Sequence, residues 1–200
     1  MANEWLTLKE EILIDSPFMK IFRKDCRSSE NKNQLHSFYL LRSRDWTNII
    51  PITKEGNVVL IKQFRLGINA HTLEIPGGVV DPQDPDIKSG AIRELVEETG
   101  YTPIANAKYQ YLGWNYPNPA IQDNKNHSFI IGPVEKTQLQ NLDPGEMIET
   151  CEVPLHEIPE LIRTHQISHA LILNAFFKLG LEDETTRNKL IEKMKEYALA

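Results

Sequence analysis

The spacing of apolar and polar residues predicts mainly strands in the first half of the chain and mainly helices in the second. Seven short segments have strand-like composition, and the polar stretch 27–34 separates the first two. The segments cover residues 17–25, 36–41, 47–53, 57–66, 71–75, 108–114 and 127–132. A turn at Lys54, Glu55 and Gly56 divides the third segment from the fourth.

Four segments are expected to be helices, and they cover residues 87–99, 153–163, 167–179 and 183–197. Pro154 would open the second helix, Ser168 lies near the start of the third, and Asp183 would cap the fourth. Strands before and after a central helix, with more helices appended, indicate an α+β protein built as an α/β/α sandwich.

Composition narrows the class of protein. A chain of 200 residues with 40% hydrophobic and 25% charged residues is typical of one soluble domain with a small appendage. The net charge of −6 argues against a nucleic-acid partner. No apolar run reaches membrane-spanning length, and the first ten residues are too polar for a signal peptide. Cys26 and Cys151 form no disulfide framework or CxxC motif, so we expect reduced thiols in a cytoplasmic protein.

Three carboxylates share one face of the first expected helix. Glu94, Glu97 and Glu98 stand at i, i+3 and i+4, and the last two precede the helix-ending Gly100. The negative end of the helix dipole disfavours anions there, and Arg93 offsets only part of the repulsion. Such clustered oxygens suit hard ions such as Mg²⁺ or Mn²⁺. Acidic runs also occur on solvated helix faces, so the residues upstream must decide between the two interpretations.

Upstream lie Pro76, Gly77 and Gly78 and then a loop that contains Asp81, Asp84 and Asp86. With the run from Arg93 to Tyr101, they resemble the signature of the Nudix hydrolases, which here spans residues 78–101. The second half of the signature matches at every specified position. In the first half, Asp84 stands where the signature has Glu, and Arg93 follows one residue late. This indicates a one-residue insertion, and Asp86 is a second candidate for the place of that Glu.

The resemblance implies the Nudix fold, in which a mixed sheet lies between helices. It also implies metal-dependent hydrolysis of a nucleoside diphosphate linked to a second group, with Mg²⁺, or alternatively Mn²⁺, as the cofactor. Glu94, Glu97, Glu98 and the backbone carbonyl of Gly77 are the implied metal ligands. Glu97 and Arg93 are counted among the catalytic residues, Arg93 as the group that orients the carboxylates.

The general base is expected outside the signature. The resemblance to ADP-ribose pyrophosphatases implies a glutamate on a later loop, and residues 143–149 have the right composition and place. Pro144 and Gly145 predict a turn that exposes Glu146, ahead of the strand-like stretch 150–153. We therefore expect Glu146, and next Glu149, to activate water or to bind metal. Two acids on an ordinary surface turn are the alternative.

A second segment resembles the same branch. Gln63, Arg65 and the lead-in Glu74-Ile75-Pro76 match the pattern of ADP-ribose pyrophosphatases. Arg65 at a strand end would bind phosphate oxygens through its planar guanidinium, beside a substrate that also lies against Gly78. Glu74 would accept hydrogen bonds from substrate or hold Arg65 in place.

The segment 114–119 carries an ambiguous clue to the substrate. Pro117 stands at the offset that marks ADP-ribose-type enzymes, and Tyr116 lies next to the offset that marks diadenosine polyphosphate hydrolases. Trp46, Trp114 and Tyr116 are candidates for stacking on a base, although packing roles are the alternative. His127 and His169 have no partners at ligand spacing and are expected to be structural.

The expected function is hydrolysis of ADP-ribose or a related nucleoside diphosphate sugar. Three alternatives are a diadenosine polyphosphate hydrolase, a non-catalytic nucleotide sensor on the same fold, and an isoprenoid diphosphate isomerase. The last is disfavoured because neither cysteine adjoins the motifs. Residues 1–45 are expected to form a small antiparallel β subdomain, and residues 46–200 the hydrolase domain. In the ADP-ribose pyrophosphatase branch such a subdomain mediates a homodimer, so a homodimer is expected here.

Overall fold

The computed structural model describes residues 4–198, which fall into two compact units. The first unit contains the chain up to Asp45 together with residues 115–125, and the second contains Trp46–Trp114 and the chain from Asn126 onward. The division of the chain into a dimerisation subdomain (1–45) and a hydrolase domain (46–200) stays a prediction. The membership of residues 115–125 was not expected, because the contacts that hold them join positions far apart in the chain.

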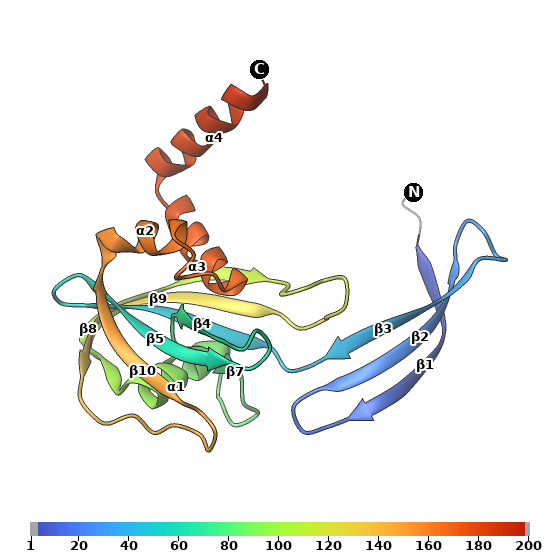
Figure 1. The fold of residues 1–200 in the computed structure, drawn as a ribbon, viewed down its shortest axis with the longest axis horizontal. Coiled ribbons are helices and arrows are strands. Elements are labelled where there is room, and N and C mark those ends of the chain that lie inside the picture. Colours follow the sequence, from blue (N-terminus) through green and yellow to red (C-terminus); the bar gives the residue numbers. More distant parts are fainter. Residues whose placement is uncertain (1–3, 199–200) are drawn as a thin grey trace. The chain divides into compact units, whose positions relative to one another are not determined.

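The first unit is built on a three-stranded antiparallel sheet in the order β1-β2-β3 (Figure 1). Its strands are β1 (Trp5–Asp15), β2 (Lys20–Ser28) and β3 (Leu35–Arg42). Strand β1 was not predicted, because its apolar residues do not alternate with polar ones and so mark no single buried face. Pairing with β2 along its length holds it in place instead.

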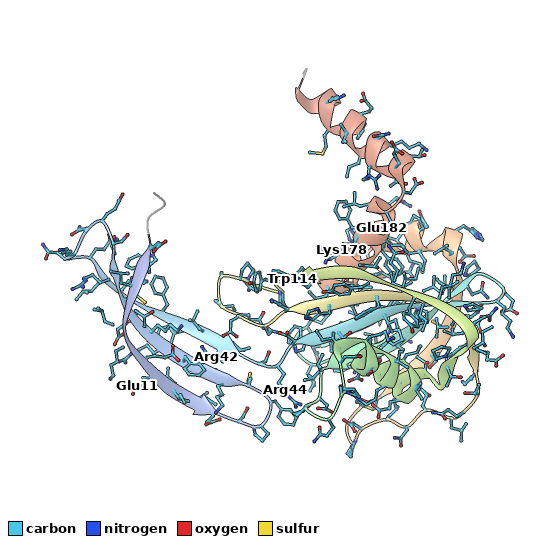
Figure 2. All side chains as sticks on the ribbon, turned by 180° about the vertical axis from the view of Figure 1, so that it is seen from behind. Glu11, Arg42, Arg44, Trp114, Lys178 and Glu182 are labelled. Carbon is cyan, nitrogen blue, oxygen red and sulfur yellow. The ribbon has the colours of Figure 1, made fainter. Side chains whose placement is uncertain are left out.

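Charged pairs cross this small sheet and tie residues 115–125 to it. Arg23 lies 3.2 Å from Glu11 of β1. Arg42, which Figure 2 labels together with Glu11, donates a hydrogen bond to Asp123 at 2.8 Å. The neighbouring Leu41 amide donates to the carbonyl of Ile121 at 2.7 Å. Residues 115–125 are therefore attached to the edge strand β3.

The second unit contains a seven-stranded sheet with the main order β10-β5-β4-β9-β8. Strand β6 pairs with β5, and β7 pairs with β4. Strands β4 and β9 are parallel, whereas β5 pairs antiparallel with β4, β6 and β10, which makes the sheet mixed. The strands are β4 (Trp46–Thr53), β5 (Asn57–Arg65), β6 (Ala70–Glu74), β7 (Gly77–Val79), β8 (Tyr101–Asn115), β9 (Asn126–Lys136) and β10 (Ile148–Pro154).

Helices cover both faces of this sheet (Figure 1). Ile49 and Val59 face α1 (Ile87–Thr99) and pack with its Leu95. The alternate residues Ile50 and Leu60 face the other side. There they pack with α2 (Ile158–Arg163) and α3 (Ala170–Leu181), and α4 (Glu184–Ala198) follows α3. The predicted α/β/α sandwich with a small N-terminal antiparallel sheet is confirmed.

The two helices that follow β10 begin later than the sequence predicted. Val153 and Pro154 belong to β10 rather than to a helix, because β10 pairs with β5 as far as Pro154 opposite Asn57. A short 3₁₀ turn at 155–157 then leads into α2. Helix α3 begins at Ala170, and its cap is His169, whose Nδ1 accepts from the Leu171 amide at 3.2 Å.

The predicted cap of the last helix is confirmed, because Asp183 accepts from the Thr186 amide at 2.7 Å. Over residues 4–198, every helix is too short or too polar to cross a membrane.

Candidate active site

The signature glycines bring the backbone of β7 against the acidic face of α1. At Gly77 a Cβ atom would collide with the carbonyl oxygen of Thr47 and with Asn48, so only glycine lets β7 pair this closely with β4. At Gly78 a Cβ atom would lie 2.5 Å from Oε1 of Glu94. The missing side chains therefore leave the carboxylates of α1 directly beside the backbone of Gly77 and Gly78.

The two candidate acids of the upstream loop have separate roles. Asp86 caps the N-terminus of α1 by accepting from the Ser89 amide at 2.7 Å. Asp84 instead accepts two hydrogen bonds from Arg93, at 3.0 and 3.1 Å, and one from the Asp81 amide at 2.8 Å. The loop thus keeps an acid on Arg93 despite the inserted residue, and Asp86 does not substitute for Asp84.

Arg93 is the cationic side chain that contacts the carboxylates on this face of α1. Its Nη1 lies 3.0 Å from Glu94 and 2.8 Å from Glu97, and its Nη2 donates to the carbonyl of Val79 at 3.0 Å. The bond to Asp84 and the nearby carboxylates hold the pKa of Arg93 above its ordinary value. Arg93 therefore contacts both carboxylates, and its role in orienting them for catalysis stays a prediction.

The carboxylates of Glu94 and Glu98 lie in the interior with too few hydrogen bonds and cations nearby to balance the cost of burying their charge. Burial raises the pKa of Glu94 to about 7, although Arg93 opposes the shift. Glu98 is 2% exposed, and its Oε2 accepts one hydrogen bond, from the Gly77 amide at 2.8 Å. Burial raises the pKa of Glu98 well above its ordinary value, and the charges of Glu94 and Glu146 raise it further.

This donor set fits a hard divalent cation. The donors are carboxylate oxygens, which Mg²⁺ and Mn²⁺ prefer. A bound cation would also compensate the negative charges of the buried glutamates, which repel one another. Among residues 4–195, no three His, Cys, Asp or Glu side chains are already gathered as a ligand set. Arg93 bridges Glu94 and Glu97 instead. The ligand roles of Glu94, Glu97, Glu98 and Gly77 therefore stay predictions.

A pocket of about 360 Å³ opens beside the signature loop. Arg65 at the end of β5 contributes to its wall, and its guanidinium contacts both oxygens of Glu74 at 2.8 and 2.7 Å. Glu74 also accepts from the Thr72 hydroxyl at 2.6 Å. Burial would raise the pKa of Glu74, but the bonds to Arg65 and Thr72 outweigh it and lower that pKa. Glu74 therefore stays ionised and holds Arg65 in place.

Five predicted site residues line this pocket. They are Trp46, Arg65, Glu74, Gly77 and Gly78. Tyr116 and Pro117 belong to the first unit, and Trp114 ends the stretch of the second unit that precedes them, so the role of each stays a prediction.

The two candidate bases differ in their surroundings. Glu146 follows Pro144 and the positive-φ Gly145 in a turn that its amide closes onto the Asp143 carbonyl at 3.0 Å. It is half-buried, and its charge raises the pKa values of Glu94 and Glu98. Glu149 lies on β10 with a 79% exposed side chain, 3.7 Å from Lys62. The electrostatic effect of Glu146 on Glu94 and Glu98 makes it the better candidate for the general base.

Four polar residues of the pocket lining were missed from the sequence: Thr47, Asn48, Asn126 and His169. His169 was expected to be structural, and it does cap α3, yet it also lines the pocket. Asn48 lies within the predicted strand 47–53, Asn126 directly precedes the predicted strand 127–132, and both line the pocket. Polar residues at buried strand positions are the signal that could have identified the two asparagines.

The comparisons with known proteins agree with this geometry. The NUDIX domain model matches residues 42–176. Over 143 residues the chain is 29% identical to the ADP-ribose pyrophosphatase of Bacillus subtilis (strain 168). The alignment covers 70% of this chain and 75% of the relative. It is 28% identical to the methanol dehydrogenase activator of Bacillus methanolicus, over 68% of this chain and 71% of the relative.

A solved structure described as an ADP compounds hydrolase superposes with a TM-score of 0.76 at 20% identity, and covers 88% of this chain and 92% of that one. At this identity the match shows a shared fold. Together with the family match over residues 42–176, it confirms what the signature predicted: the chain belongs to the Nudix family.

Proposed function

We propose that this protein hydrolyses the pyrophosphate bond of ADP-ribose or a related nucleoside diphosphate sugar. The observation that carries the proposal is the meeting of two kinds of group at the signature loop. Arg65, held by Glu74, offers a cationic fork for phosphate oxygens. Gly77, against Glu98, and Gly78, against Glu94, line the same pocket. The similarity to an ADP-ribose pyrophosphatase supports this choice of substrate.

The reaction needs negative charge to be neutralised. Nudix hydrolases generally use divalent cations, and we propose Mg²⁺, with Mn²⁺ as the alternative, held by Glu94, Glu97, Glu98 and the carbonyl of Gly77. When bound, such a cation neutralises phosphate oxygens and lowers the pKa of water. Arg93 keeps Glu94 and Glu97 oriented, and Arg65 holds the pyrophosphate in place.

Glu146 takes the proton from the attacking water in this proposal. Its turn places it close enough to influence Glu94, Glu98 and Arg65 electrostatically. The carboxylate can then accept the proton beside the acidic face, while Arg65 stabilises charge on the phosphates. The products are AMP and ribose 5-phosphate from ADP-ribose, or a nucleoside monophosphate and a sugar phosphate from a nucleotide sugar.

A substrate panel tests the proposal. kcat/KM is measured with Mg²⁺ for ADP-ribose, nucleotide sugars, diadenosine polyphosphates, NADH and coenzyme A. The products are separated by chromatography, and the Glu98→Gln variant serves as the inactive control. ADP-ribose or a nucleotide sugar should give the highest value. A preference of more than tenfold for diadenosine polyphosphates would refute the proposal and make Tyr116 the true marker.

We further propose a homodimer formed through the first unit, in the cytoplasm, where Cys26 and Cys151 stay as the free thiols seen here. Large apolar side chains of the first unit are exposed, and they include Trp5, Leu8, Ile12 and Leu13 of β1 and Phe18 of the turn that follows it. A three-stranded sheet is too small to bury them by itself, so a second copy supports the unit. Light scattering at micromolar concentration should give a dimer mass. Ile12→Glu should give a monomer, whereas Lys32→Glu, in a loop of the same unit, should not.

A further inference from the structure

The floor of the pocket contains buried neutral polar groups where the rest of the sheet face is apolar. Along β4, Ile50 and Asn48 alternate onto the face that α3 covers, and Ile50 belongs to the core there. Along β9, Ile130 packs against the same core, and Asn126 lies four residues before it on that face. The face thus changes from isoleucine to polar residues on both strands, to Asn48 on β4 and to the buried Ser128 and then Asn126 on β9.

The two asparagines are buried without full hydrogen bonding. Asn48 is 4% exposed and Asn126 is 1% exposed. Nδ2 of Asn48 lies 3.5 Å from Oδ1 of Asn126, which is a long contact. Within the part of the chain that the structure describes, Oδ1 of Asn48 and Nδ2 of Asn126 have no hydrogen-bond partner. Each such group lowers the stability of the fold when nothing satisfies it.

The chemistry of the unpaired atoms defines what would satisfy them. The pair offers one acceptor and one donor and no charge, and this complements a hydroxyl group, which both donates and accepts. A phosphate would leave the acceptor unpaired, and the same pocket already provides Arg65 for phosphate. The neutral asparagine pair therefore suits a part of the substrate next to the pyrophosphate and not the pyrophosphate itself.

We propose that Asn48 and Asn126 form a subsite for a hydroxyl group of the sugar attached to the nucleoside diphosphate. This rests on the proposed function, which supplies a pyrophosphate that carries such a sugar. The subsite makes the enzyme specific for the group beyond the pyrophosphate. Specificity of this kind is strong because a substrate without the hydroxyl leaves both buried amides unpaired.

Two substrates that differ only in the sugar test the subsite. ADP-ribose carries it, and the methyl ester of ADP has the same adenosine and pyrophosphate without it. The variants Asn48→Leu and Asn126→Leu keep the volume and remove the hydrogen-bonding atoms. Asn174→Leu is the matched control, because Asn174 also has a side-chain oxygen without a partner but lies outside the pocket lining. kcat/KM for both substrates and the melting temperature are measured for each protein.

Each pocket variant should lower kcat/KM for ADP-ribose by about three- to tenfold, the range that one hydrogen bond supports, and leave the methyl ester unchanged. Its melting temperature should be kept or raised, because an apolar side chain replaces an unsatisfied amide. An equal loss on both substrates, no loss on either, or a variant that fails to fold would refute the subsite while the proposed function stands. Wild-type protein that hydrolyses neither substrate would refute the proposed function and the subsite with it.

Discussion

Two glutamates in this protein are equally buried, yet their pKa values are shifted in opposite directions. Glu74 and Glu98 are each 2% exposed. Glu74 contacts the guanidinium of Arg65 with both oxygens, and its pKa is lowered. Glu98 accepts one hydrogen bond from a backbone amide, and burial raises its pKa. The protein itself supplies the partner of the first carboxylate and leaves the second one largely uncompensated.

The difference separates an acid whose charge is paired within the fold from an acid whose charge is not. A buried charge is tolerated when it is paired and hydrogen-bonded, and it is costly otherwise. Glu74 meets that condition within the fold and so serves to fix Arg65. Glu98 lacks such a partner, and in the proposed function a bound cation would supply it; without the cation, protonation removes the charge instead.

The largest effect should come from neutralising Glu98. Glu98→Gln should lower kcat by about 10²-fold or more, because charge stabilisation in the reaction depends on the cation. The same substitution should raise the melting temperature of the metal-free protein, since it removes a buried charge. Activity is measured with Mg²⁺ and stability by calorimetry in excess chelator. Full activity of the variant, or full activity of the wild type in chelator, would contradict the assignment.

Removing Arg65 should leave the buried carboxylate of Glu74 without its cationic partner. Arg65→Ala should raise KM by about ten- to a hundredfold, through loss of a charge-assisted contact with phosphate worth roughly 1.5–3 kcal/mol. It should also raise the pKa of Glu74, which nuclear magnetic resonance titration can follow. Arg163→Ala is the control, because Arg163 forms an exposed pair with Glu160 on α2. An unchanged KM would show that Arg65 binds only Glu74.

A smaller effect on turnover should distinguish Glu146 from Glu149. Glu146→Gln should lower kcat by about tenfold or more with little change in KM, the lower part of the range for a positioned base. Glu149→Gln should leave kcat nearly unchanged, because that side chain is exposed beside Lys62. Steady-state kinetics with the preferred substrate decide the matter. The reverse order of effects would move the base to β10.

The smallest effect concerns the stability of the metal-free protein as a function of pH. The pKa of Glu94 is about 7 in the folded protein and near 4.5 when exposed, so the folded state keeps a proton that the unfolded state loses between these values. The free energy of unfolding should therefore fall as pH rises through this window, by on the order of 1–3 kcal/mol. Glu94→Gln should flatten this dependence, and saturating Mg²⁺ should oppose it. A free energy that rises with pH would contradict the assignment.

The sequence was sufficient for the helix and the fold because its signals there are local. Gly100 and the acidic spacing lie within one helical turn of the features they specify, and α1 has the predicted bounds. The family resemblance then supplied the sandwich around it. Strand β1 was missed because long-range pairing with β2, and not its own pattern, holds it extended.

The parts of the site that were missed depend on packing between distant segments. Asn48 and Asn126 meet only because β4 and β9 are parallel neighbours, and no local pattern encodes that pairing. The upstream loop was a similar case. Asp84 and Asp86 were equivalent candidates in the sequence, and only the contact of Asp84 with Arg93 separates them.

The clustering of residues 115–125 with the first 45 residues has a consequence for protein engineering. The covalent chain passes between the two units at three places, after Asp45, after Trp114 and after residue 125. A deletion of residues 1–45 would therefore not excise the small unit. It would leave the eleven residues 115–125 in the protein without two of their partners. These are the Leu41 amide, which bonds to Ile121, and the Arg42 guanidinium, which bonds to Asp123. A clean single-unit protein needs two deletions, of residues 1–45 and 115–125, and a short bridge from residue 114 to residue 126.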